Sequence, residues 1–327
     1  MTTARSLLVD SEAPGFYHCI SRCVRRAWLC GIDPYDGKSY EHRREWVEQR
    51  LLELAKIFAV GVYAYAVMSN HVHVVVRVDP GAPAMWSDED VATRWIRLFP
   101  ATANGEVDAL ASRTKQQNLL GNAERLAVCR NRLGNLAWFM RSLNEPIARR
   151  ANREDACTGR FWEGRYKCQA LLDQAAVLTC MSYVDLNPIR AGIAEDLESS
   201  FHTSAVHRIA KIKANTRAAK EPLAAINSNT PITFLSITTE DYLDLIDWTA
   251  RQTSPDKHGK VAASEPPILQ KLGLAESQWT QQMLGTETRY WRAIGSAQAL
   301  IEKAAAIGQS WLKGIGEAQR LMTRQVV

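Results

Sequence analysis

Apolar and polar positions alternate in several stretches of the chain, a pattern that predicts β-strands. One such stretch covers residues 15–23, and two largely apolar runs, 60–68 and 71–78, flank a short turn around Ser69 and Asn70. Side chains two positions apart on a strand point to the same face of the sheet. We therefore expect a first strand, followed after an intervening helix by a β-hairpin.

Apolar residues at helical spacing predict the helices that accompany these strands. The expected elements are a helix at about 41–58, a helix at 87–99 with a serine cap and an acidic first turn, a loop at 100–122, a long helix at about 123–152 that Pro146 kinks or interrupts, a strand or irregular ribbon at 159–171, and a helix at 173–186. The order strand, helix, two strands, helices, strand, helix predicts an α+β fold: a ferredoxin-like antiparallel sheet with helices on one face.

The C-terminal third has a different pattern and suggests a second domain. A basic stretch at 211–220 is typical of a linker or a fraying helix, and short helices are expected at 239–251, 267–272, 276–284 and 288–313. We therefore predict a core domain at 1–203 with an insertion at about 79–123, followed by a helical accessory domain at 204–327.

Composition narrows the function classes without choosing among them. The 327 residues are 46% hydrophobic and 23% charged, which is typical of a globular protein, and no apolar run suits a membrane span or a signal peptide. A net charge of +5 is compatible with a nucleic-acid partner. The seven cysteines are expected to be reduced thiols of a cytoplasmic protein. The spacing of Cys19, Cys23 and Cys30 does not match a zinc ribbon, so we expect core residues there.

His71 and His73 are the first candidates for chemistry. They lie two apart on a predicted strand and therefore share one face, where a divalent metal would satisfy both imidazoles. Tyr183 and Asn187, if they share one helix, also face the same way. Two imidazoles and an amide oxygen leave open positions on Mg²⁺ or Mn²⁺, which would act as a Lewis acid on a phosphate oxygen. A tyrosine nucleophile suits this step, because its phosphodiester is a stable covalent intermediate.

Each of these residues also has a structural interpretation. Tyr183 is suited to packing on a sheet, and Asn187 to ending a helix before Pro188. His18, a single histidine on a strand, is more typical of a structural residue than of a ligand. The functional interpretation requires Tyr183 and Asn187 to lie beside the histidines in the folded protein, whereas the structural interpretation does not.

The ribbon at 159–171 mixes basic and aromatic residues. Arg160, Arg165 and Lys167 are suited to phosphate contacts, and Trp162 to stacking on a base, a contact worth about 1–3 kcal/mol. The alternatives are a solvated strand edge for the basic residues and a core position for Trp162. We favour the interpretation as a DNA-binding segment.

Four blocks of sequence together resemble the single-tyrosine HUH transposases, in particular the REP-associated tyrosine transposases. The blocks are YHCISR at 17–22, MSNHVH at 68–73, GRFWEGRYK at 159–167 and YVDLNPIRAG at 183–192. The resemblance runs from about residue 16 to about residue 202. It implies an HUH endonuclease core with His71, His73 and Asn187 as metal ligands and Tyr183 as the nucleophile.

The resemblance implies a metal-dependent endonuclease or transposase that nicks and rejoins hairpin-forming single-stranded DNA through a 5′-phosphotyrosine. The expected cofactor is Mg²⁺ or Mn²⁺, the expected partner is DNA rather than a membrane, and both a monomer and a homodimer are compatible with it. Because the expected partner is DNA, we expect the protein in the cytoplasm, in association with the nucleoid. The main alternative is a domesticated regulator that binds DNA hairpins and has lost cleavage. A phosphodiesterase that uses water fits less well, because no carboxylate cluster accompanies the histidines.

Overall fold

The core of the molecule is a mixed α+β structure built on one sheet. A computed structural model describes residues 7–24, 29–33, 37–228, 237–253, 266–288 and 292–323. Within these ranges five strands form a mostly antiparallel sheet in the order β2-β3-β1-β6-β7. The strands are β1 (Gly15–Arg22), β2 (Val60–Val67), β3 (His71–Val78), β6 (Lys167–Leu171) and β7 (Ala293–Ile294).

Strand β1 lies at the centre and aligns the polar residues of its neighbours. It pairs antiparallel with β3 on one side and with β6 on the other. This register places Ile20 opposite His73, and His18 opposite both Val75 and Gln169. Directly paired residues of antiparallel strands share a face. The four strands predicted from the sequence are therefore present, and β7 adds a fifth strand parallel to β6, where a helix was expected.

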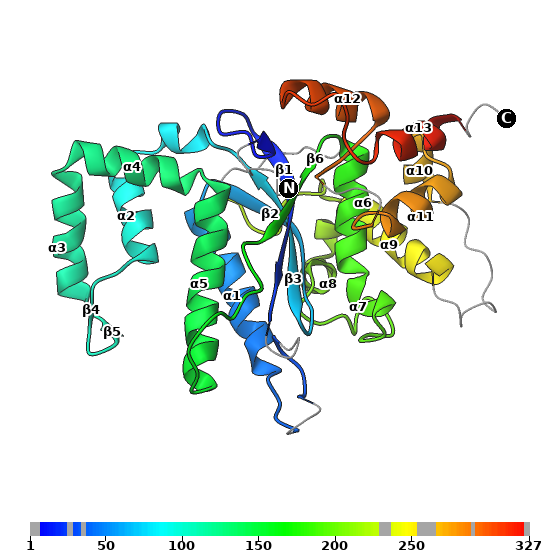
Figure 1. Ribbon diagram of the computed structural model, residues 1–327. Helices are drawn as coiled ribbons and strands as arrows, with labels where there is room; N and C mark the ends of the chain where they lie inside the picture. The colour runs from blue at the N-terminus through cyan, green and yellow to red at the C-terminus, as the bar shows by residue number, and fades with distance from the viewer. Residues whose placement is uncertain are drawn as a thin grey trace.

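Helices cover both faces of this sheet (Figure 1). The helices concerned are α1 (His42–Ile57), α5 (Leu136–Glu154) and α6 (Gln174–Asp185). On one face, Tyr65 donates a hydrogen bond to Glu48 of α1 at 2.5 Å, and Asn144 of α5 donates to Ser21 at 2.8 Å. Helix α6 lies against the opposite face, which carries His73. The expectation that helices occupy one face is corrected here: the apolar residues of β2 and β3 line both faces, and both need cover.

The insertion after β3 forms a helical projection (Figure 1). It contains η2 (Ala82–Met85), α2 (Asp88–Leu98), the hairpin β4 (Thr102–Ala103) and β5 (Glu106–Val107), α3 (Ala109–Leu120) and α4 (Ala123–Leu133). Ser87 caps α2 as predicted, by accepting a hydrogen bond from the Asp90 amide. The loop expected at 100–122 is instead the hairpin and α3. Helix α3 buries only Ser112 and Leu119, so its sequence has no apolar stripe to reveal it.

The long helix expected at 123–152 is two helices, α4 and α5. The chain turns at Gly134, where a Cβ would lie only 3.0 Å from the carbonyl oxygen of Pro80. Asn135 then caps α5 by accepting from the amides of Ala137 and Trp138. Pro146 does not interrupt α5, which continues to Glu154.

The C-terminal part packs against the core through buried polar contacts. Its described elements are α8 (Ser204–Ala214), η3 (Thr216–Lys220), α9 (Thr239–Thr253), α10 (Pro267–Lys271), α11 (Glu276–Leu284), β7, α12 (Ala297–Ala306) and α13 (Ile315–Thr323). The buried carboxylate of Asp185 in α6 accepts from the Ala205 amide at 2.9 Å and from the Tyr242 hydroxyl at 2.6 Å. Arg208 donates to the Tyr63 carbonyl of β2 at 2.7 Å. The division after residue 203 stays a prediction, but these contacts cross it.

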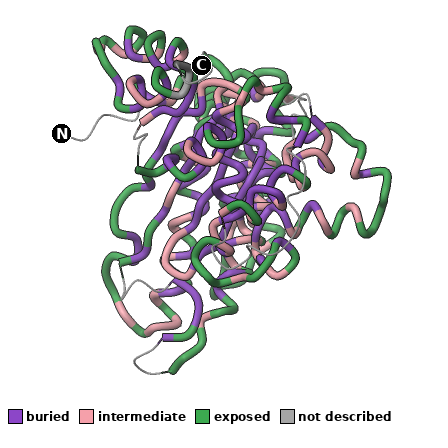
Figure 2. Tube along the Cα trace, turned by 90° about the vertical axis from the view of Figure 1, so that its right-hand side faces the viewer, coloured by how far each residue is buried: buried purple, intermediate pink, exposed green. Residues whose placement is uncertain are grey.

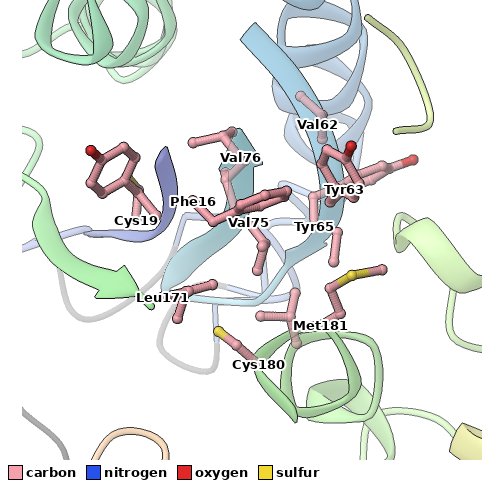
Figure 3. Close-up of a cluster of buried hydrophobic side chains, with 14 of the residues drawn as sticks. Phe16, Cys19, Val62, Tyr63, Tyr65, Val75, Val76, Leu171, Cys180 and Met181 are labelled. Carbon is pink, nitrogen blue, oxygen red and sulfur yellow. The ribbon is translucent and has the colours of Figure 1, made fainter. Parts of the chain in front are cut away.

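Buried residues concentrate in the sheet and the helices beside it (Figure 2). Figure 3 shows Cys180 and Met181 of α6 pointing toward Val75 and Leu171 of the sheet. Cys19, Cys23 and Cys30 are buried free thiols in this core. No helix in the described ranges has the length and apolarity needed to cross a membrane.

Candidate active site

The two histidines of β3 project together from the face covered by α6. Their ring centroids are 4.6 Å apart, and the His73 ring lies edge to edge with that of His18 from β1, with the centroids 5.2 Å apart and the planes inclined by 15°. His18 and His73 are completely buried, whereas His71 at the strand end is partly exposed. The alternation of the strands thus places three imidazoles on one surface.

Helix α6 and the short helix after it bring the other predicted residues to this surface. Tyr183 lies in the last turn of α6, with its ring centroid 5.8 Å from that of His73. Asn187 begins α7 (Asn187–Arg190), and its Nδ2 lies 3.1 Å from His73 Nε2. The two residues thus occupy consecutive helices rather than one, since Leu186 separates α6 from α7. Their side chains nevertheless reach the same histidine.

A cleft of about 410 Å³ opens at this point. It is lined by Ile20, Arg22, Asn70, His71, Glu163, Gly164, Arg165, Lys167, Tyr183, Asn187 and Glu287. Five of the predicted residues therefore share one cavity, although they come from elements far apart in the sequence: His71, Arg165, Lys167, Tyr183 and Asn187. His73 lies buried beside the cleft and is not among its lining residues. The convergence of these residues is the main property of the site.

The walls of the cleft carry three basic side chains and the two carboxylates of Glu163 and Glu287. Arg22, Arg165 and Lys167 line it, and the guanidinium of Arg190 lies over the Tyr183 ring at 4.7 Å from the centroid. Of the predicted DNA-binding residues, Arg165 and Lys167 therefore reach the cleft. Arg160 is not among the lining residues; it is exposed and donates to the Glu163 carbonyl.

Trp162 takes a core position rather than a place in the cleft. Its side chain is 9% exposed, its indole N–H donates to the Asn144 carbonyl of α5 at 2.8 Å, and its ring packs on Phe161. It lines a larger groove of about 990 Å³, together with Arg165. Base stacking in the cleft is therefore not available to Trp162, because its indole packs against the α5 face of the sheet.

Sequence reasoning missed Glu287, which follows α11 in the C-terminal part. Its carboxylate lies 3.5 Å from His73 Nε2, and it lines the same cleft as Tyr183, whose pKa is raised by burial and by the charge of Glu287. Gln169 was also missed; it joins His18 to the C-terminal part. No local pattern marks either residue as functional, because each reaches the histidines only through tertiary packing.

Burial sets the protonation of the site. It lowers the pKa of His71 to about 4, lowers that of His73 well below its usual value and lowers that of His18. The three imidazoles are therefore neutral at pH 7. Burial, together with the charge of Glu287, raises the pKa of Tyr183 above its ordinary value. The phenol thus holds its proton until a partner accepts it.

The donor chemistry of the site fits a divalent metal. Neutral imidazoles on His71 and His73, the Asn187 amide and the Glu287 carboxylate combine nitrogen and oxygen donors of the kind that Mg²⁺ and Mn²⁺ accept. An amide can turn its oxygen to the position of its nitrogen, so Asn187 offers either atom. Among the described residues, no group of three or more His, Cys, Asp or Glu side chains is placed to hold a metal ion, so the fit rests on the types of donor.

Comparisons with known proteins add little to this geometry. No protein-family model matches the chain, and no curated protein matches it. One solved structure, of a REP-associated tyrosine transposase bound to a REP hairpin, aligns with 73% of this chain and 97% of its own, at 10% identity and a TM-score of 0.32. A TM-score of this size does not establish a shared fold, so the functional argument rests on the site itself.

Proposed function

We propose that this chain is a metal-dependent endonuclease or transposase that cuts and rejoins hairpin-forming single-stranded DNA through a covalent phosphotyrosine. The observation that carries the proposal is the position of the Tyr183 phenol, in one cleft with His71 and Asn187 and beside His73. The resemblance of the sequence to HUH transposases supplies the substrate class. The ferredoxin-like arrangement of β2, β3, β1 and β6 is part of the same proposal.

The basic side chains of the cleft would bind the DNA backbone. Arg22, Arg165 and Lys167 offer charged donors to phosphate oxygens, which neutralise charge and position the strand. The metal, when bound at His71, His73 and Asn187, would stabilise negative charge on the phosphate under attack. Because these contacts are to the backbone, they orient the strand without reading its bases.

Tyr183 then makes the new bond. Its Oη attacks phosphorus while its proton passes to the Glu287 carboxylate, which lines the same cleft. The bond from phosphorus to the 3′ oxygen of the preceding nucleotide breaks, and that oxygen takes a proton from water. The product is a 5′-phosphotyrosine and a free 3′ hydroxyl. A later 3′ hydroxyl reverses the step and rejoins the strand without outside energy.

The decisive experiment is covalent trapping. The full chain is incubated with 3′-end-labelled hairpin DNA carrying a single-stranded extension, in Mn²⁺, and is then run on a denaturing gel. We expect a labelled protein band for the wild type and none for Tyr183→Phe. Tyr63→Phe is the matched control, because Tyr63 is a buried phenol of β2 outside the cleft. A band of equal strength from Tyr183→Phe would refute the proposal.

A native gel of the same mixture, run beside the denaturing gel, distinguishes the alternative function from the proposed one. A domesticated regulator would bind the labelled hairpin on a native gel and give no covalent band with any metal. That result would assign the cleft to hairpin binding alone.

A further inference from the structure

A chain of buried polar groups runs across the sheet beneath the cleft. Gln169 of β6, His18 of β1 and His73 of β3 project on the face covered by α6, and all three side chains are buried. Gln169 Nε2 contacts the Thr286 carbonyl at 2.9 Å, and Gln169 Oε1 contacts His18 Nδ1 at 2.8 Å. His18 Nε2 in turn contacts His73 Nδ1 at 2.9 Å.

The chemistry of these groups fixes the direction of every hydrogen bond. The Thr286 carbonyl only accepts, so the Gln169 amide nitrogen donates to it and the Gln169 oxygen faces His18. That oxygen also only accepts, so the proton of the neutral His18 ring lies on Nδ1, and Nε2 carries the lone pair. His73 must then donate from Nδ1. Its own lone pair is left on Nε2, the atom 3.1 Å from Asn187.

The reverse direction is unfavourable. Turning the Gln169 amide over would place its oxygen against the Thr286 carbonyl oxygen, two acceptors in a fully buried position. A doubly protonated His18 would remove the constraint on His73, but it would put a charge on a ring with no exposed surface. Burial lowers the pKa of both rings, in agreement with neutral imidazoles.

We propose that His18 and Gln169 are positioning residues that hold His73 in the Nδ1–H tautomer, so that His73 Nε2 presents its lone pair to a divalent cation in the cleft. This inference rests on the proposed function for the cation, while the tautomer stands on the hydrogen bonds alone. Metal-binding histidines commonly depend on such a partner for the second ring nitrogen, and loss of the partner typically costs 10- to 100-fold in metal affinity. This series of hydrogen bonds begins at the Thr286 carbonyl, so the C-terminal part helps to fix the tautomer of His73.

The first test reads the tautomer directly. The metal-free full chain is labelled with ¹⁵N-histidine, and long-range ¹H–¹⁵N correlation spectra distinguish protonated from unprotonated ring nitrogens. We expect Nδ1–H and a bare Nε2 for both His18 and His73, with His18→Gln and His73→Ala spectra assigning the signals. A proton on Nε2 of His73 in the wild type would overturn the proposal.

The second test measures Mn²⁺ affinity from the free-ion EPR signal. His18→Phe keeps the ring volume but removes the acceptor, so we expect a 10- to 100-fold weaker affinity and a mixed His73 tautomer. His18→Gln should restore most of the affinity, because an amide offers a donor and an acceptor about as far apart as the two ring nitrogens. Cys168→Ala is the control, since Cys168 neighbours Gln169 on β6 but faces the other side of the sheet.

The outcomes separate the two proposals. If His18→Phe is unfolded by circular dichroism, Gln169→Met, which keeps the length of the side chain, takes its place with the same expectation. A folded His18→Phe or Gln169→Met that binds Mn²⁺ as the wild type does would overturn the positioning role. If the wild type shows the expected tautomer but binds no Mn²⁺, the metal dependence of the proposed function fails, and the cation half of this inference fails with it.

Discussion

Among single residues, the imidazoles of the site show how burial changes the protonation state of a side chain. His71, His73 and His18 lose hydration on folding, and this lowers the pKa of each ring. A neutral imidazole is the form that binds a metal, so the proposed cation would meet unprotonated rings at pH 7. The same burial makes folding sensitive to acid.

The first prediction follows from the pKa of His71, which burial lowers to about 4. Between pH 6.5 and about 4 the unfolded chain binds a proton at His71 and the folded chain does not. The contribution of His71 to the free energy of unfolding is therefore complete above pH 6.5. It decreases as the pH falls, by at most about 1.4 kcal/mol per pH unit. Urea unfolding in chelator across this range should show the loss, with a smaller pH dependence in His71→Gln. An identical dependence in both proteins would contradict the assigned shift.

Among the elements, α6 carries Tyr183, the proposed nucleophile, and is fixed at its end by Asp185. This carboxylate, two residues after Tyr183, is completely buried and accepts hydrogen bonds from Ser204, the Ala205 amide and Tyr242. Burial raises the pKa of Asp185, and the hydrogen bonds from Ser204 and Tyr242 oppose that rise. The end of α6 is thus held by residues of α8 and α9.

The second prediction tests this anchor. Asp185→Ala leaves several buried donors without an acceptor, so we expect the free energy of unfolding to fall by about 3 kcal/mol, measured in urea. Tyr242→Phe removes one of these hydrogen bonds and should cost about 1 kcal/mol. Asp196→Ala, a substitution in an exposed turn, serves as the control. Equal stabilities of Asp185→Ala and Asp196→Ala would show that the buried contacts do not hold α6.

In the whole molecule, the C-terminal part contributes to both the fold and the site. It adds β7 to the sheet, contacts Asp185 from α8 and α9, and supplies the Thr286 carbonyl and the Glu287 carboxylate beside His73. Helix α11 also packs along α6 and buries Trp279 and Met283. These contacts connect the predicted accessory domain to the centre of the proposed chemistry.

The third prediction concerns truncation after residue 203. The shortened chain would expose the apolar face of α6 and leave Asp185 without its partners in α8 and α9, so we expect aggregation or the loss of a cooperative unfolding transition. Size-exclusion chromatography and urea unfolding monitored by fluorescence provide the measurement. A truncated chain that unfolds cooperatively would instead support the two-domain division predicted from the sequence.

The fourth prediction concerns Glu287→Gln, which removes a negative charge from the cleft and keeps the shape of the side chain. In a Tyr183→Phe background with chelator, hairpin DNA should bind several-fold more tightly, because the carboxylate no longer repels phosphate. With Tyr183 present and Mn²⁺ added, covalent adduct should form on the order of 100-fold more slowly, because the proton acceptor is lost.

Glu163→Gln is the matched control, since Glu163 lines the same cleft on the ribbon. A Glu287→Gln variant that forms adduct at the rate of the Glu163→Gln variant would remove Glu287 from the proton transfer.

The sequence by itself determined strands β1, β2, β3 and β6, the common face of His71 and His73, and the helix that carries Tyr183. These features follow from local periodicity, because alternation on a strand and spacing on a helix are set by backbone geometry. The spacing of apolar residues did not predict the break between α4 and α5 at Gly134, since this break depends on close approach to Pro80. The same spacing did not predict helix α3, because an exposed helix needs no apolar stripe.

Only the tertiary structure decided which polar groups meet. His18 seemed an isolated strand histidine, yet its partners are Gln169, 151 positions away in the chain, and His73. Glu287 reaches His73 from the C-terminal part, and Trp162 lies in the core rather than in the cleft. Such contacts are set by how elements pack, which no local pattern records. The residue types therefore indicated the chemistry, and the packing of α6 and the C-terminal part against the sheet assembled the cleft.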